Sequence, residues 1–168
     1  KKELKEPKNN CQQCERLAEF RSENKLTEPT WHNGPVKSFG SLNSQLLVVG
    51  LAPGLKGANR TGRPFTGDFA GDLLYPTLER LGLACGNYGR SNDDSIQLRN
   101  CRITNAVRCV PPKNKPTTNE IRQCNTFLQS EIAAMASLKI VLALGHIAHN
   151  AVLRSFSIKQ SKHRFKHG

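Results

Sequence analysis

Long apolar runs are absent from this sequence of 168 residues. An apolar stretch such as QLLVVG, residues 45–50, is far shorter than the roughly 20 apolar residues that cross a bilayer. The opening residues, KKELKEPKNN, are charged and contain no apolar segment of the kind found in secretory signals. These two absences count against a membrane protein and a secreted one, and we expect a cytoplasmic protein with no membrane partner.

Acidic residues are scarce as well. The sequence has 13 Asp and Glu against 25 Lys and Arg, which gives a formal net charge of +12. An excess of this size favours a polyanionic partner such as DNA or RNA, although solubility alone is the simpler interpretation. The length suits one domain over residues 1–168 with its own hydrophobic core, and we expect a monomer.

Disulfides are not expected, because they are uncommon in cytosolic proteins. The six cysteines are Cys11, Cys14, Cys85, Cys101, Cys109 and Cys124. The first pair forms a C-x-x-C motif, and the last pair flanks a proline-rich loop and the start of an expected helix. Four thiolates from two separated segments can bind a zinc ion or a four-iron cluster, and the spacing does not choose between them. The middle two have no close partner in the sequence and read as small buried hydrophobes.

Strand-like and helical patterns alternate along the chain. We expect strands at residues 45–51, 101–110 and 139–145. We expect one helix to begin near residue 11 and three more to cover residues 70–83, 120–138 and 146–156. The proline-rich loop before the third of these helices ends in a capping signal. This alternation predicts a layered α/β fold with a parallel sheet. Ligands bind such sheets beyond the carboxyl ends of the strands.

Two local patterns add detail to this expectation. Residues 28–41, which contain prolines and glycines, read as a loop. The helix at 70–83 is expected to bury one leucine face, and its Pro76 suggests a shifted start. That face would consist of Leu73, Leu74, Leu78 and Leu81.

A loop of 19 residues, GLAPGLKGANRTGRPFTGD at 50–68, follows the first expected strand and contains five glycines. Glycine loses more backbone freedom on folding than other residues, so five of them indicate sharp turns or a close approach to a ligand. A phosphate-binding loop is the competing interpretation. Neither G-x-x-x-x-G-K-[ST] nor G-x-G-x-x-G follows the strand, and two prolines remove N–H donors, which argues against nucleotide binding.

Several stretches together resemble the iron–sulfur uracil-DNA glycosylases, specifically family 5, the type B enzymes. The stretches are CQQC, WHNGPVKSFG, LLVVGLAPGLKGANRTGRPFTGDFAGD, ITNAVRCVPPKNKPTTNEIRQC and LALGHIAH. They occur in the family's order from Cys11 to Gly168. The related family 4 carries an acid after the first glycine of the loop, where this sequence has Leu51, as in family 5.

This resemblance implies a three-layer α/β/α sandwich around a central parallel sheet of the uracil-DNA glycosylase type. It implies a DNA repair enzyme that flips uracil, or another deaminated base, out of DNA and hydrolyses its N-glycosidic bond, leaving an abasic site. It also implies a structural 4Fe-4S cluster, with no cofactor in the chemical step. The ligands of that cluster would be Cys11, Cys14, Cys109 and Cys124.

Three side chains match the family's base pocket. Asp68 would orient water or stabilise positive charge on the sugar, and the alternative is a helix N-cap, for which Asp is favoured. Phe65 would stack on the extruded uracil, against the alternative of ordinary core packing. Asn105 would read the uracil edge, because an amide both donates and accepts hydrogen bonds. The alternative for Asn105 is a strand-end amide satisfied by backbone groups.

The backbone of the loop would complete this pocket. Glycines such as Gly50 would permit a close approach, and N–H groups around Leu51 and Ala52 would bind the charge that develops on a uracil oxygen. Three cations would contact DNA phosphates beside the pocket, namely Lys56, Arg60 and Arg63. The loop is therefore interpreted as the wall of a base pocket.

The family pattern continues beyond KHRFKHG with another strand and a loop that bears a histidine. We therefore expect the domain to be C-terminally incomplete, with the last strand missing and a sheet edge unpaired. The histidines present do not match the family's one: we expect packing or phosphate roles for His146 and His149, and a solvated basic tail around His163 and His167. Two function classes stay open, a uracil-DNA glycosylase and a catalytically impaired glycosylase-like iron–sulfur protein that only binds nucleic acid or a larger assembly.

Overall fold

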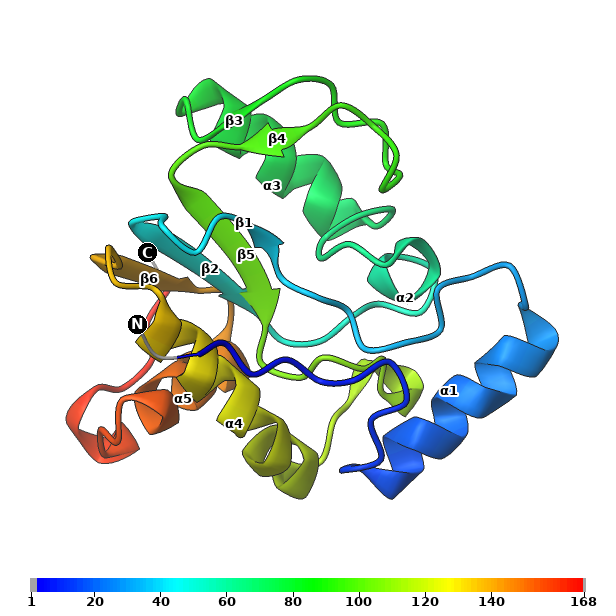
Figure 1. Cartoon of the computed structure of the whole chain (residues 1–168). Coiled ribbons are helices and arrows are strands. Elements are labelled where there is room, and N and C mark those ends of the chain that lie inside the picture. Colours follow the sequence, from blue (N-terminus) through cyan, green and yellow to red (C-terminus); the bar gives the residue numbers. More distant parts are fainter. Residues whose placement is uncertain (1–2, 168) are drawn as a thin grey trace.

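The computed structural model describes residues 3–167. Its centre is a four-stranded sheet in the order β1–β5–β2–β6 (Figure 1). The strands are β1 (Phe39–Gly40), β2 (Leu46–Gly50), β5 (Cys101–Asn105) and β6 (Ile140–Ala143). Strands β5, β2 and β6 are parallel, as the sequence predicts, and β1 adds an antiparallel strand at one edge.

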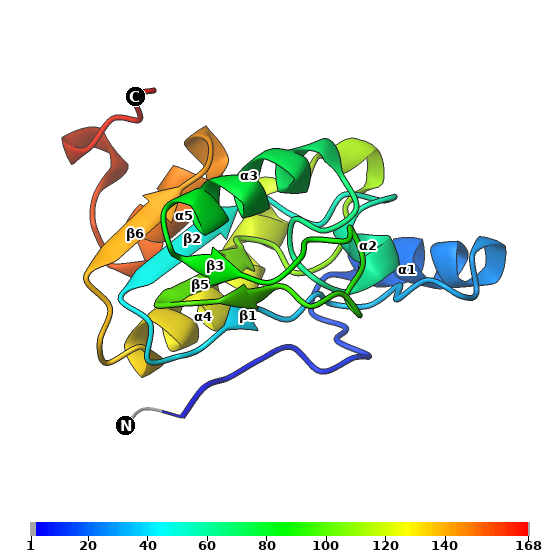
Figure 2. The ribbon, with the colours of Figure 1, turned by 90° about the horizontal axis from the view of Figure 1, so that it is seen from above.

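Helices cover both faces of the sheet, so the fold is a three-layer α/β/α sandwich (Figure 2). Helix α3 (Phe69–Arg80) lies on one face, and α4 (Thr118–Ala134) and α5 (His146–Ser155) lie on the other. Successive side chains of β2 point to opposite faces: Leu47 and Val49 pack with α4 and α5, whereas Val48 packs with α3. Burial on both faces explains the unbroken apolar run of this strand. No helix in the described part of the chain combines the length and apolarity that a membrane span requires.

The starts of α1 and α4 agree with the sequence. Helix α1 (Glu15–Thr27) begins directly after the C-x-x-C motif, with Cys14 at its N-cap position. Helix α4 has a complete capping box: Thr117 Oγ1 accepts from the Glu120 N–H, and the Glu120 carboxylate accepts from the Thr117 N–H. The two helices pack together near the cysteines.

The shortest elements escape the sequence-based prediction. They are β1, the single helical turn α2 (Ala58–Thr61), the hairpin of β3 (Ala84–Cys85) and β4 (Gln97–Leu98), and the 3-10 turns η1 (Pro112–Asn114) and η2 (Gln160–Lys162). The interpretation of residues 28–41 as loop is therefore wrong at 39–40, which pair with β5. Elements of two to four residues are too short to carry a periodic pattern.

The buried face of α3 differs from the expected leucine face. Tyr75 and Leu78 are buried, whereas Leu73 and Leu81 are each 67% exposed. Tyr75 is 0% exposed, and an aromatic ring of that size determines which face the helix turns to the sheet. The leucine pattern left this residue out, which is why it predicted the wrong face. Pro76 lies inside the helix.

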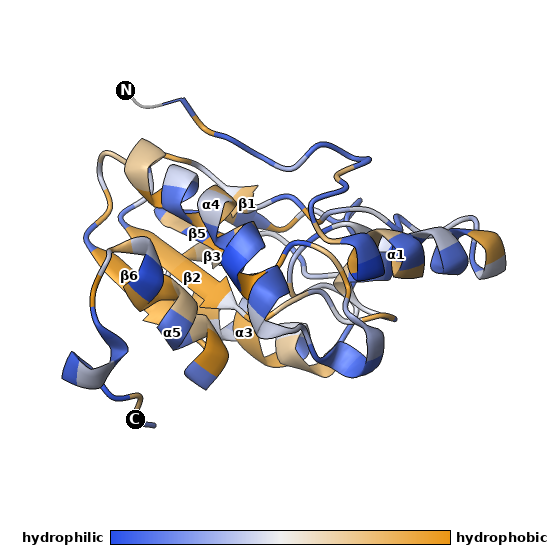
Figure 3. Ribbon diagram, turned by 90° about the horizontal axis from the view of Figure 1, so that it is seen from below, coloured by the Kyte–Doolittle hydropathy of each residue, from blue (hydrophilic) through white to orange (hydrophobic). Residues whose placement is uncertain are grey.

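Strand β6 forms an open edge of the sheet in the described part of the chain, where it pairs only with β2. Its Ile140 and Leu142 are 62% and 45% exposed. Figure 3 shows β6 in the orange of hydrophobic residues. An apolar strand with an unpaired edge is a site where another strand can add, and its presence agrees with the sequence-based expectation of an unpaired edge.

A buried ion triad joins β5 to α4. Glu131 is 0% exposed and accepts hydrogen bonds from Arg102 Nε and Arg108 Nη2, both at 2.6 Å. Burial alone would raise the pKa of Glu131, but the charges of Arg108 and Arg102 outweigh it and hold the pKa below its ordinary value. Glu131 is therefore ionised at neutral pH.

We expect Glu131→Gln to lower the free energy of unfolding by about 2 kcal/mol, because it leaves two buried guanidinium groups without a counter-charge. The stabilisation by Glu131 is present above its unfolded-state pKa of about 4.3 and is lost as the pH falls through the lower folded-state pKa. Urea unfolding of the two proteins at a series of pH values measures this. The exposed Glu79 provides the control, since Glu79→Gln removes the same charge without a buried partner. A difference between wild type and Glu131→Gln that stays constant into acid would contradict the prediction.

Candidate functional site

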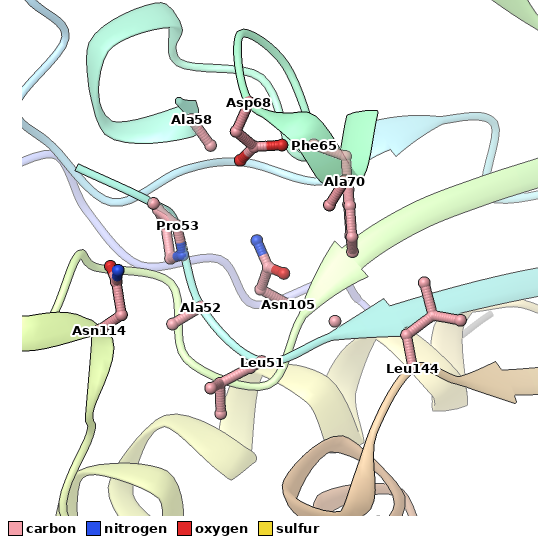
Figure 4. A pocket seen from close by; sticks show the side chains of 12 residues that line it. Leu51, Ala52, Pro53, Ala58, Phe65, Asp68, Ala70, Asn105, Asn114 and Leu144 are labelled. Carbon is pink, nitrogen blue, oxygen red and sulfur yellow. The ribbon is translucent and has the colours of Figure 1, made fainter. Parts of the chain in front are cut away.

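A pocket opens beyond the carboxyl ends of β2 and β5 (Figure 4). Every residue that the sequence assigns to contact with a base lines it: Gly50, Leu51, Ala52, Phe65, Asp68 and Asn105. The pocket lies where open α/β sheets bind their ligands. The structure thus brings these six residues together from three segments of the chain.

Gly50 and Asn105 face each other at the ends of two neighbouring parallel strands. A Cβ built on Gly50 would lie 2.5 Å from Asn105 Oδ1 and 2.8 Å from Phe65 Cε2, closer than real Cβ atoms come to such atoms. The absence of a side chain at residue 50 therefore lets the amide and the ring share one pocket. This is a close approach that only glycine permits.

The Asn105 side chain is 4% exposed and points into the pocket, toward Asp68 and Phe65 (Figure 4). None of the hydrogen bonds found among residues 3–167 involves the Asn105 amide, whose atoms border the pocket and are not enclosed in the protein interior. A buried amide without a partner costs free energy unless water or a ligand bonds to it. The alternative of an amide satisfied by backbone groups is therefore wrong, and the amide is available to a ligand.

Asp68 serves the helix and the pocket with different oxygen atoms. Its Oδ1 accepts a hydrogen bond from the Gly71 N–H at 3.0 Å, which makes Asp68 the N-cap of α3. Its Oδ2 lies against the glycine-rich loop, where a Cβ on Gly57 would overlap it. From the sequence, a helix cap and a place in the pocket were alternatives for Asp68. In the structure, Asp68 caps α3 and also lines the pocket. The cap also holds the carboxylate in one orientation.

Phe65 has a φ of 52°, a left-handed conformation that bulky residues rarely adopt. Its carbonyl oxygen accepts a hydrogen bond from Tyr88 Oη at 3.2 Å, and a Cβ on Gly71 would overlap that oxygen. The ring packs partly on the core below α3 and partly forms the pocket wall. Core packing does not require this backbone strain, which is typical of side chains positioned for function.

Three lining residues outside the loop at 50–68 were not named from the sequence, Ala70, Asn114 and Leu144. Asn114 has a φ of 55°, which asparagine tolerates, and ends η1 after the proline-rich loop. Leu144 follows β6 directly. A usable signal existed for Leu144, because parallel strands end at the same edge of a sheet.

The three loop cations have different environments. Lys56 and Arg60 are exposed, which agrees with a phosphate-binding role. Arg63 is 6% exposed and donates to both carboxylate oxygens of Asp94 at 2.8 and 2.7 Å. Its guanidinium also stacks on the Tyr75 ring, 5.3 Å from the centroid. These contacts contradict the prediction that Arg63 contacts phosphate, because the side chain is enclosed and its Nε, Nη1 and Nη2 atoms already donate to Thr66 and Asp94.

Four cysteines surround one small cavity between α1 and α4. They are Cys11, Cys14, Cys109 and Cys124, the ligand set that the family resemblance implies. Cys101 instead lies in the core on the α3 side of the sheet, as expected for a small hydrophobe. Convergence of two distant pairs is the arrangement that a shared metal centre needs.

Two buried arginines line the same cavity. Arg21 is 6% exposed, and its Nη1 donates to Cys109 Sγ at 2.8 Å while Nη2 donates to Cys11 O at 2.7 Å. Arg108 Nε is buried without a hydrogen-bond partner in the described residues. Buried cations require nearby negative charge. Thiolates bound to a metal centre supply such charge, so the surroundings fit one.

The thiols themselves are poor anions in these surroundings. Burial raises the pKa of Cys14 to about 11 and that of Cys124 to about 12. A bound metal reverses this effect, because coordination deprotonates a thiol. Among residues 3–167, no three His, Cys, Asp or Glu side chains lie close enough to hold one metal ion.

The family model described as "Uracil DNA glycosylase superfamily" matches residues 37–166, which contain the whole base pocket. The chain belongs to the uracil DNA glycosylase superfamily. In this member of the superfamily, the α/β sandwich holds a pocket that is lined by an acid, an aromatic ring and an amide.

Curated relatives refine the position within the superfamily. A protein named Type-5 uracil-DNA glycosylase from Thermus thermophilus is 43% identical over 164 residues, which cover 94% of this chain and 74% of that protein. Another of that name from Pyrobaculum aerophilum is 42% identical over 163 residues, 95% of this chain and 71% of that protein. A Type-4 uracil-DNA glycosylase from the same organism is 31% identical over 133 residues, 79% of this chain and 60% of that protein. The chain is thus more similar to these Type-5 proteins, in agreement with Leu51.

The C-terminal histidines of this superfamily member lie outside the pocket lining. His149 Nε2 lies 2.8 Å from His163 O, and the Phe165 ring packs edge-on against the rings of His146 and His149. This agrees with the packing role expected for the helix pair. His163 and His167 are exposed, as expected for a solvated basic tail, and Phe165 between them packs on α5.

Proposed function

We propose that the protein is a uracil-DNA glycosylase, which removes uracil from DNA and leaves an abasic site. The observation that carries the proposal is the buried Asn105 amide, without a partner in the described residues, in one pocket with the Asp68 carboxylate and the Phe65 ring. These groups are an edge reader, an acid and a stacking face around the space for one base. Excision of a flipped base needs all three.

The pocket would hold uracil by its face and its edge. The Phe65 ring stacks on the base, and the Asn105 amide donates to a carbonyl oxygen while accepting from the ring N–H. Backbone N–H groups around Leu51 and Ala52 stabilise the charge that develops on a uracil oxygen. Residues 50–52 can approach closely because Gly50 carries no side chain.

Asp68 would act on the sugar. The bond between the sugar C1′ and the base nitrogen breaks, uracil leaves with the electron pair, and a water oxygen bonds to C1′ while a proton of that water passes through solvent to the uracil anion. The Asp68 carboxylate orients that water or stabilises positive charge on the sugar, and its capping bond to Gly71 holds it ready. No cofactor takes part in this step.

Uracil release tests the proposal. The full-length protein, with its four-cysteine site loaded, is incubated with single- and double-stranded oligonucleotides that contain one uracil, and free uracil is measured. We expect uracil release from DNA and none from matched oligonucleotides with thymine. Binding of the uracil DNA without any release would overturn the enzyme and leave the alternative, a glycosylase-like protein that only binds nucleic acid.

DNA phosphates would contact the two exposed loop cations, Lys56 and Arg60. Both lie on the loop that also supplies the pocket wall, so a backbone bound there would bring a base to the pocket. Phosphate contacts release counterions, and the affinity for DNA of any sequence should therefore fall steeply with salt. The net charge of +12 acts in the same direction.

The four-cysteine site would hold a structural 4Fe-4S cluster. Cys11, Cys14, Cys109 and Cys124 line one cavity yet do not meet the spacing for one shared ion. In a cluster each thiolate binds a different iron, so the four sulfurs stand further apart than around a single zinc. The cluster would tie α1 to α4, and the buried Arg21 and Arg108 would balance its negative charge.

We expect the double variant Cys11→Ser/Cys14→Ser to lose its iron and to unfold at a lower temperature, because α1 is then held by few other contacts. The control is Cys85→Ala, a thiol outside the cavity, which should keep about four irons per chain. Iron analysis of anaerobically purified protein and thermal melts measure both. Unchanged iron in the double variant, or zinc in place of iron in the wild type, would contradict the assignment.

A further inference from the structure

A second hollow lies next to α2, away from the base pocket. Three segments meet there: residues 30–32 before β1, Arg60 and Thr61 of α2, and residues 90–92 between β3 and β4. Its volume is about 430 Å³. Ala58 of α2 lines the base pocket, and Arg60, two residues later, lies on the opposite side of the helical turn. One short helix therefore forms a wall of both spaces.

The wall of this hollow is held in place by the backbone. The His32 N–H donates to Arg60 O and the Asn33 N–H donates to Asn59 O, both at 3.0 Å. The His32 ring packs closely on Gly62, where a Cβ would lie 3.1 Å from its Cγ. These contacts fasten the segment that carries Trp31 onto α2.

Two arginines give the hollow a positive charge. Among the described residues, Arg60 makes one side-chain hydrogen bond, from Nε to Lys56 O at 2.9 Å, which leaves the outer guanidinium nitrogens free. Arg90 pairs with Asp72 at 3.2 Å, and both side chains are accessible to solvent. Exposed pairs of this kind are weak, so a phosphate can replace the carboxylate. Among residues 3–167, none of those that line the hollow is acidic.

An aromatic ring lies among these cations. Trp31 lines the hollow and is half-buried, and Ser91 and Asn92 add polar groups to its lining. Proteins that hold single-stranded nucleic acid combine a positively charged groove with aromatic rings on which bases stack. The hollow shows both features within one space.

We propose that this hollow binds a nucleotide of the same DNA strand within about three positions of the extruded one, with its phosphate between Arg60 and Arg90 and its base against Trp31. The proposal rests on the proposed function, because the strand that passes α2 is the one whose base enters the base pocket. The two spaces are separated by one helical turn, which is about 10 Å across with its side chains. A strand with the duplex spacing of about 3.4 Å per nucleotide crosses that distance in about three nucleotides. The hollow would thus hold the strand while a base occupies the neighbouring pocket.

Trp31 is the only tryptophan in the chain, so its fluorescence reports on this hollow directly. The wild-type protein is titrated with a short oligothymidylate that contains no uracil, and binding is followed in parallel by the anisotropy of a dye on the DNA. We expect the tryptophan emission to be quenched as the DNA saturates, since a stacked base quenches the indole. Unchanged emission at saturation would overturn the proposal.

Arginine variants provide a second, independent measurement. We expect Arg90→Ala to weaken oligothymidylate binding about tenfold, and Trp31→Ala to do the same with Trp31→Phe restoring most of the affinity. The matched control is Arg99→Ala, which removes the same charge at the opposite end of the strands, between β4 and β5. Equal affinities of Arg90→Ala and Arg99→Ala would also overturn the proposal.

The outcomes separate this proposal from the proposed function. Uracil release by the wild type without any tryptophan quenching would reject the hollow and keep the glycosylase. Quenching with the expected variant pattern, but without uracil release, would reject the glycosylase and keep a single-strand site beside α2. Arg90→Ala carries the test if Trp31→Ala does not fold.

Discussion

Asp68→Asn should lower the rate of uracil release by a factor of about 10² to 10³, which corresponds to about 3 kcal/mol of lost transition-state stabilisation. The physical reason is charge, because the carboxylate is proposed to act on positive charge that develops on the sugar as the bond breaks. DNA binding should change little, since that charge is absent from the ground state. Single-turnover release of uracil and anisotropy titrations measure the two effects separately.

The capping role of Asp68 makes this experiment well controlled. Asparagine caps helices as well as aspartate does, so α3 keeps its hydrogen bond from Gly71 and its stability in the variant. Asp68→Ser also preserves a cap and should be as inactive. Asp68→Ala removes both functions and should in addition lose about 1 kcal/mol of folding stability. Normal uracil release by Asp68→Asn would show that Asp68 is a cap and nothing more.

Asn105→Ala should slow uracil release about 10²-fold, because one preorganised donor to the leaving base is lost and its partner on the base is left unpaired. Asn105→Asp should be no better, since a carboxylate of the same shape cannot donate to a carbonyl oxygen. Both variants should also discriminate less between uracil and other bases. Release rates on oligonucleotides with different single bases measure this discrimination.

The matched control for Asn105 is Asn114→Ala. Asn114 lines the same pocket but is exposed at its rim, so its amide is bonded by water in the free protein. Asn114→Ala should therefore slow uracil release much less than Asn105→Ala does. An effect of Asn114→Ala as large as that of Asn105→Ala would mean that the buried amide has no special role.

The parallel strands could be predicted from the sequence, but not where each of them ends. The continuous apolar run at residues 46–50 gives a buried strand. The strand expected at 101–110 stops at Asn105, so the rule that ligands bind at the carboxyl ends predicts the edge of the sheet, whereas the pairing of Gly50 with Asn105 comes from the structure. The roles of Asp68 and Phe65 came from the family resemblance, because a helix cap and a core aromatic explain the same residues locally. In the structure Asp68 caps α3 and Phe65 packs on the core, and both also line the pocket where the proposed roles require them.

The rest depended on contacts between segments far apart in the sequence. Arg63 looked like its exposed neighbour Arg60, and only the position of Asp94, 31 residues further on, decides that it is buried. The orientation of α3 likewise depends on where Tyr75 meets the sheet. The hollow beside α2 is lined by three such segments, and no local sequence pattern in any of them predicts it.

The register between β2 and β5 has a consequence for how this chain can change its length. Asn105 shares a face of the sheet with Cys101 and Ile103, the α3 side, from which Asp68 and Phe65 also reach the pocket. Side chains alternate along a strand, so an insertion or deletion of one residue within β5 would turn the amide away from the pocket, to the face of the sheet that packs against α4 and α5. Homologous genes should therefore vary in length between β3 and β4 while keeping β2 and β5 free of insertions and deletions.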